Sequence, residues 1–194
     1  MDIDAIAQAL EAHSWCVVPD FLDKRLTTAL AEECRAFDAG ASLVPASTGR
    51  GAGRQRSALR GDRTRWFEPD CPTAAQADFF SRMDAVRVAL NRRLLLGLED
   101  LEAHYALYPP GAGYMRHLDR FRDDDARVMS AVAYLNGEWH DTDGGHLRLH
   151  LPDGPHDVVP RGGTLALFLS AEIEHEVLPA SRERLSIAGW FRRR

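Results

Sequence analysis

The chain of 194 residues lacks a long apolar run, a basic excess and a complete set of cysteine pairs. No apolar run reaches the length of a membrane span, and the start, Met1 to Asp4, lacks the basic residues of a secretory signal. The net charge of −5 argues against general nucleic-acid binding, which needs a basic surface. Cys16, Cys34 and Cys71 have no metal-binding spacing and leave an odd thiol in any disulfide scheme. We therefore expect a soluble protein of the reducing cytoplasm, with no nucleic-acid or membrane partner.

The pattern of apolar residues predicts helices first and strands afterwards. Apolar spacings of three and four predict helices over 4–13, 23–37 and 73–98, with Asp23 as a cap, and a short strand is expected at 14–18. From Leu101 onward, short runs separated by Gly, Pro and Asp predict a sandwich, a barrel or a jelly roll. The expected strands are 103–107, 128–135, 146–151, 157–159, 164–169, 174–178 and 185–191. The length suits one domain over 1–194, mostly β with bracing helices.

Two histidines, an aspartate and an arginine form the most informative pattern. His117 and Asp119 project from the same face of an extended segment, because they are two positions apart. With His175, which follows an apolar strand, they could form the two-histidine, one-carboxylate face of non-haem Fe(II) oxygenases. That face leaves three metal positions open for a co-substrate and O2. Arg184 could hold the far carboxylate of a dicarboxylic co-substrate, although a lone H-x-D pair is common by chance.

Several stretches between Ala58 and Phe191 occur in an order that carries a family resemblance. They are ALRGDRTRW (58–66), YPPGAGYMRHLD (108–119), AYLNGEW (133–139), GGHLRL (144–149), HEV (175–177) with Pro179, and Arg184 followed by GWF (189–191). The series resembles the 2-oxoglutarate- and Fe(II)-dependent prolyl hydroxylases of the oxygen-sensing type and their bacterial relatives. The resemblance implies a double-stranded β-helix, which is a distorted, cupin-like jelly roll. Its catalytic core would be 101–194, with 1–100 as helical support and substrate loop.

The resemblance also implies roles for single residues. It makes His117, Asp119 and His175 the Fe(II) ligands, and Arg184 the partner of the C5 carboxylate of 2-oxoglutarate, shared with Tyr134. It places Tyr108 and Trp190 beside the co-substrate pocket and Arg127 near the substrate entrance. The alternative for the tyrosines is ordinary strand packing with a polar tip at the surface. The implied reaction consumes O2 and 2-oxoglutarate, hydroxylates a prolyl residue, and releases succinate and CO2.

A segment rich in glycine and arginine contains Arg54 and Arg56 and is too polar to form a core element. By resemblance it is a flexible loop that closes over a peptide, with Arg60, Asp62 and Trp66 anchoring its return. Its arginines suit a substrate with carboxylates near the target residue. A solvated linker and an RNA-contacting patch are the alternatives.

The expected partner is a protein that presents a proline to a monomeric enzyme. The resemblance to bacterial members makes a translation factor such as elongation factor Tu a candidate. A hydroxylase of a free amino acid or another small molecule, and a silent module that senses 2-oxoglutarate or metal, remain alternatives. A second metal site among His140, Asp143, His146 and His150 is less favoured than a surface sheet edge.

Overall fold

The computed structural model describes residues 3–46, 60–120 and 125–193. The predicted substrate-loop residues Arg54 and Arg56 lie outside this part of the chain. The helices are α1 (Ile3–His13), α2 (Lys24–Ala39), α3 (Ala74–Leu94) and a short 3-10 helix, η2 (Asp141–Asp143). The strands are β1 (Trp15–Val18), β2 (Val44–Pro45), β3 (Arg63–Trp66), β4 (Asp100–Tyr108), β5 (Tyr114–His117), β6 (Arg127–Tyr134), β7 (Leu147–Leu151), β8 (Gly154–Val158), β9 (Leu165–Leu169), β10 (Glu174–Val177) and β11 (Arg184–Arg192).

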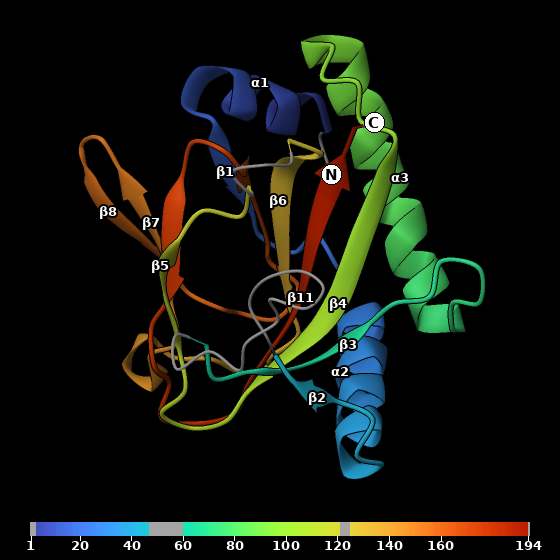
Figure 1. Cartoon of the computed structure of the whole chain (residues 1–194), viewed down its shortest axis with the longest axis vertical. Coiled ribbons are helices and arrows are strands. Elements are labelled where there is room, and N and C mark those ends of the chain that lie inside the picture. Colours follow the sequence, from blue (N-terminus) through green and yellow to red (C-terminus); the bar gives the residue numbers. More distant parts are fainter. Residues whose placement is uncertain (1–2, 47–59, 121–124, 194) are drawn as a thin grey trace.

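Two antiparallel sheets face each other, as a jelly roll requires. The major sheet has the strand order β1-β9-β6-β11-β4-β3-β2, and the minor sheet has the order β5-β10-β7-β8. The three α-helices, α1, α2 and α3, lie on one side of the major sheet, and the minor sheet lies on the other side (Figure 1). The major sheet therefore separates a helix-side core from an inner space between the sheets.

Helix caps explain where α2 and α3 begin. The side chain of Asp23 accepts a hydrogen bond from the Leu26 N–H at 2.9 Å, which confirms the predicted cap. Thr73 caps α3 in the same way, by accepting from the Gln76 N–H at 3.2 Å. Each cap satisfies one backbone donor that has no partner within the helix.

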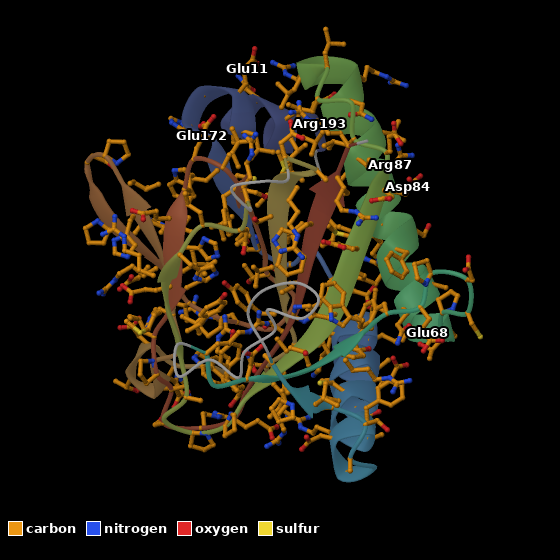
Figure 2. All side chains as sticks on the ribbon, in the orientation of Figure 1. Glu11, Glu68, Asp84, Arg87, Glu172 and Arg193 are labelled. Atoms are coloured by element: carbon orange, nitrogen blue, oxygen red, sulfur yellow. The ribbon has the colours of Figure 1, made fainter. Side chains whose placement is uncertain are left out.

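The predicted helix 73–98 is too long, because α3 ends at Leu94. Leu95 has a φ of 53°, in the left-handed region where a helix stops. Beyond it, the amide of Asn91 binds both the N–H and the carbonyl of Leu98, at 2.8 and 2.7 Å. Arg87, labelled beside Asp84 on α3 in Figure 2, donates to the same carbonyl at 3.0 Å. These side chains turn the chain back toward β4.

All of the predicted strands are present, whereas β2, β3 and β5 were not predicted as strands. The sequences of β3 and β5 are RTRW and YMRH, and neither has the apolar alternation that marks a half-buried strand. The first strand begins at Trp15 and not at Ser14, because Ser14 has a left-handed φ of 64°. Pairing with neighbouring strands, rather than local sequence, therefore defines these elements.

The thiols agree with the cysteine pattern of the sequence. Cys16 and Cys34 are buried and Cys71 is exposed, and none of them forms a disulfide. Burial raises the pKa of the Cys16 and Cys34 thiols to about 12, so both are protonated and unreactive at neutral pH. Within the described ranges, no helix combines the length and apolar character needed to cross a bilayer.

Candidate metal and co-substrate site

The pairing of β5 with β10 brings two distant histidines together. His117 ends β5 and lies opposite His175 in the register of the pair. Asp119 follows two residues after His117, and its carboxylate lies 3.5 Å from His117 Nε2 and 3.4 Å from His175 Nε2. One potential ligand atom from each of the three residues lies within 4.8 Å of the others. Such a group can hold one metal ion on one face.

Backbone carbonyls orient both imidazoles toward the same point. His117 Nδ1 lies 2.7 Å from the Met115 carbonyl, and His175 Nδ1 lies 3.2 Å from the Ile173 carbonyl. A carbonyl can only accept, so each Nδ1 carries the proton and each Nε2 keeps its lone pair. This is the tautomer in which Nε2 can bind a metal.

The protonation states of Asp119 and His175 also favour the binding of a cation. Burial alone would raise the pKa of Asp119, but His175, His117 and the Ser130 hydroxyl hold it well below its usual range. Burial lowers the pKa of His175, and the nearby Asp119 opposes this effect only in part. At neutral pH the aspartate is therefore ionised and His175 is neutral, as metal coordination requires.

An aromatic ring packs against each of the two imidazoles. The Tyr114 ring is stacked on His117 at a centroid distance of 3.7 Å, and the edge of Phe168 contacts His175 at 4.6 Å. The guanidinium of Arg60 lies 4.9 Å from the centre of the Tyr114 ring. Arg60 and Asp62, predicted to anchor the substrate loop, bind each other through two hydrogen bonds of 2.6 and 2.8 Å. This buried ion pair thus supports the segment that carries His117.

Arg184, at the start of β11, is a buried cation with an unsatisfied donor. Its Nε donates to the Gly145 carbonyl at 2.8 Å and its Nη1 donates to Ser186 Oγ at 3.2 Å. Its Nη2 and the hydroxyl of Tyr134 are buried and have no hydrogen-bond partner. In the described part of the chain, no ion pair includes Arg184. Burying a cation without an ion pair costs free energy, and an anion that bound to the guanidinium would offset this cost.

The tyrosines predicted for the co-substrate pocket are buried rather than at the surface. Tyr134 is fully buried and Tyr108 is 4% exposed, and the Arg184 guanidinium lies 5.3 and 5.1 Å from their ring centres. Burial raises the pKa of Tyr134 to about 12, so its phenol remains a hydrogen-bond donor at neutral pH. Both tyrosines share a buried cluster with Phe168, the residue that contacts His175. The cluster links the Arg184 pocket to the metal-binding group.

Trp190 lies on the inner face of β11, beside Ser130 of β6. Its indole N–H is buried without a hydrogen-bond partner, and the Arg127 guanidinium covers the ring at 3.6 Å. His104 and Trp66 complete the group at ring distances of 5.5 and 5.9 Å from Trp190. Trp66 is 42% exposed, so this aromatic group extends from the inner space to the surface.

The remaining histidines do not form a second metal site in the described ranges. His146 Nε2 lies 2.9 Å from Asp141, and His150 Nε2 lies 3.0 Å from Glu176. The only group there that could hold a metal ion consists of His117, Asp119 and His175. The strand that carries His150, β7, lies between β10 and β8, so it is not the sheet edge that the sequence suggested.

Two serines beside Asp119 were missed by the sequence reasoning. Ser130 Oγ donates to Asp119 Oδ2 at 2.7 Å, and Ser170 Oγ lies 2.8 Å from Ser130 Oγ. Ser130 falls within the apolar strand β6, where a serine is usually a tolerated core residue. No local signal marks it as a partner of a carboxylate eleven positions upstream.

Comparison with known proteins agrees with this geometry. The family described as the 2OG-Fe(II) oxygenase superfamily matches residues 103–192. A crystal structure of a Pseudomonas putida prolyl-4-hydroxylase is 51% identical, has a TM-score of 0.91, and is matched over 99% of both chains. A prolyl hydroxylase from Trichoplax adhaerens, solved with a hypoxia-inducible factor peptide, is 25% identical, with a TM-score of 0.88 over 98% of this chain and 88% of that one.

Human Egl nine homolog 1 is 30% identical over 202 residues, which is 97% of this chain and 46% of the human protein. The chain thus spans less than half the length of this curated relative. The predicted double-stranded β-helix is confirmed by the fold that these relatives share with the chain. The chain belongs to the 2OG-Fe(II) oxygenase superfamily, whose members use Fe(II), 2-oxoglutarate and O2, and within it resembles the prolyl hydroxylases.

Proposed function

We propose that the protein is a 2-oxoglutarate- and Fe(II)-dependent dioxygenase that hydroxylates a prolyl residue in a protein substrate. One observation carries the proposal: a two-histidine, one-carboxylate group lies beside a buried arginine whose Nη2 has no partner. The first part fits Fe(II), and the second fits the far carboxylate of 2-oxoglutarate. The 51% identity to a bacterial prolyl-4-hydroxylase supports the choice of proline.

In this proposal each residue has a limited task. His117, Asp119 and His175 would hold Fe(II), which with 2-oxoglutarate and O2 supplies the oxidising chemistry. Arg184 would bind the C5 carboxylate through Nη2, with the Tyr134 hydroxyl as a second donor. Burial of both donors would strengthen these hydrogen bonds and exclude water from the far end of the co-substrate.

Tyr108 would line the same pocket as a neutral phenol, because burial raises its pKa well above the ordinary value. The substrate would enter beside the aromatic group of Trp190, Trp66 and Arg127, since Trp66 is the exposed end of that group. The Trp190 N–H, which has no partner, is available to an acceptor of the bound ligands. The predicted closing loop with Arg54 and Arg56 remains a prediction.

We further propose that the substrate is a translation factor such as elongation factor Tu. A monomer in the cytoplasm, without nucleic-acid partners, and one catalytic domain over 1–194 are the corresponding expectations. The support is the match to a bacterial prolyl-4-hydroxylase, which is 51% identical over 99% of both chains. Size-exclusion chromatography with light scattering tests the monomer directly.

The deciding experiment uses purified protein, Fe(II), 2-oxoglutarate, O2 and a bacterial lysate. Tryptic peptides are searched by mass spectrometry for one added oxygen, with His175→Ala as the inactive control. We expect an oxygen on a proline that requires His175, and its peptide identifies the partner. An intact 2-oxoglutarate site with no modified peptide in any fraction would instead favour a small-molecule substrate.

A further inference from the structure

We infer that Ser130 and Ser170 form a positioning pair that sets the orientation of the Asp119 carboxylate and so determines metal affinity. The inference rests on the proposed assignment of Asp119 as a metal ligand. Asp119 lies two residues after the end of β5 and outside any strand. A ligand in such a position needs support from elsewhere in the fold.

The hydroxyl protons of the pair have only one consistent arrangement. Ser130 Oγ donates to Asp119 Oδ2 at 2.7 Å, and this contact uses the single proton of the Ser130 hydroxyl. Ser130 Oγ must then accept across the 2.8 Å contact, and Ser170 is the donor. The order is therefore Ser170 to Ser130 to Asp119.

Burial makes this relay rigid. Ser130 is 1% exposed and Ser170 is fully buried, so bulk water does not compete for either hydroxyl. Ser130 lies in β6, inside the major sheet between β9 and β11. The support for Asp119 thus comes from a buried residue on an inner strand of the major sheet.

The backbone of Ser170 also forms hydrogen bonds near Asp119. Its carbonyl accepts from the Arg120 N–H at 3.2 Å, and its own N–H donates to the Val128 carbonyl at 3.1 Å. Ser170 therefore fixes the residue after Asp119 through its backbone and supports the Asp119 side chain through Ser130. The backbone contact with Arg120 and the side-chain contact through Ser130 therefore both support the segment 119–120.

The chemistry of the site explains why this orientation matters. Three protein ligands would leave positions on the ion open for the co-substrates. An aspartate that turned to bind through both oxygens would occupy one of those positions, and one that turned away would release the ion. Ser130 binds Oδ2 of Asp119, so Oδ1 would remain available to hold the metal.

The test measures binding of Mn(II) alone by calorimetry, so it needs no substrate. We expect Ser130→Ala to weaken Mn(II) binding by about 10- to 100-fold, the usual effect of losing a partner of a metal ligand. Ser130→Thr, which keeps the hydroxyl, should restore binding to near the wild-type level. Ser170→Ala should have an effect in the same direction but smaller, because the Ser130 hydroxyl remains.

Thr27→Val is the matched control for losing a buried hydroxyl. Thr27 lies on α2, is 8% exposed, and donates to the Asp23 carbonyl at 2.9 Å, remote from the metal group. Its loss should lower the unfolding temperature and leave Mn(II) affinity unchanged. Equal weakening by Thr27→Val and Ser130→Ala, or wild-type affinity in Ser130→Ala, overturns the inference.

Two further variants keep the result interpretable. If Ser130→Ala does not fold, Ser170→Ala decides the matter, because wild-type Mn(II) affinity in that variant overturns the relay. His175→Ala tests the ligand assignment itself and should abolish binding. Wild-type affinity in His175→Ala would overturn that assignment, and with it the role of Ser130, whereas a loss confined to the serine variants and His175→Ala supports both.

Discussion

The two faces of β11 border two buried regions with opposite chemistry. Leu185, Ile187 and Phe191 point to the helix side, where they are at most 1% exposed in an apolar core. The alternate residues Arg184 and Trp190 point between the sheets, where each retains a buried donor without a partner. Residues two apart share a face of a strand, so one strand supplies stability on one side and ligand contacts on the other. We therefore expect mutations on the helix side of β11 to lower stability, and mutations on its inner face to lower ligand affinity.

The largest effect is expected for Phe191→Ala on the helix side. Removing this fully buried ring should lower the free energy of unfolding by about 3–5 kcal/mol, through lost burial and the cavity left behind. For a chain of this size, the unfolding temperature should fall by about 10 °C or more. Calorimetric unfolding measures the change, with Phe191→Leu as a milder control. Below the transition, affinities for Mn(II) and 2-oxoglutarate should not change, and a parallel loss of either would contradict the separation of the two faces.

The next largest effect is expected for Arg184→Gln on the inner face. The affinity of the Mn(II)-loaded protein for 2-oxoglutarate should fall by about 100-fold, because the buried cation that meets the far carboxylate is gone. The ligand-free protein should unfold at the same temperature or higher, since a buried charge without an ion pair is removed. Arg184→Lys should rescue little, because an ammonium lacks the planar fork. A loss of stability as large as that of Phe191→Ala would make Arg184 a structural residue.

A smaller effect concerns His104 on the inner face, whose ring packs near Trp66 and Trp190 and whose Nδ1 lies 3.0 Å from the Tyr105 carbonyl. Burial lowers its pKa to about 4, so as the pH falls the unfolded chain takes up the proton first. The stability contributed by the neutral ring is complete above the unfolded pKa and is lost as pH falls toward the folded one.

Between about pH 7.5 and pH 5 this histidine should account for about 2 kcal/mol of lost stability. Denaturant unfolding at several pH values measures it. The variant His104→Phe should show a flatter pH dependence, and the exposed His13→Gln should follow the wild type. Identical slopes for His104→Phe and wild type would show that another group is responsible.

The sequence predicted the parts of this comparison that depend on local spacing. The apolar run over 185–191 predicted a strand, and the H-x-D spacing predicted that His117 and Asp119 project from one face. His175 and Arg184 were joined to that pair through the family resemblance. Asp23 was recognised as a cap because its signal lies within one helical turn. The strand, the H-x-D spacing and the helix cap depend on neighbours in the sequence and can be read without a structure.

The features that were missed depend on contacts between distant segments. The strand β5 exists because it pairs with β10, and Ser130 meets Asp119 only after β6 and the turn beyond β5 are assembled. The end of α3 depends on Asn91 binding Leu98, which a periodic pattern does not contain. Pairing and side-chain contacts of this kind follow from the fold and not from propensity.

The opposition of His117 and His175 has a consequence for how the chain folds. These residues come from strands that are far apart in the sequence, and the binding point exists only after β5 and β10 have paired. Closing a long loop before its contacts can form is slow, so this pairing is expected late in folding. An ion that binds only the closed pair would stabilise the native state by mass action. Bound metal would then raise the stability of the folded protein as well as support its activity.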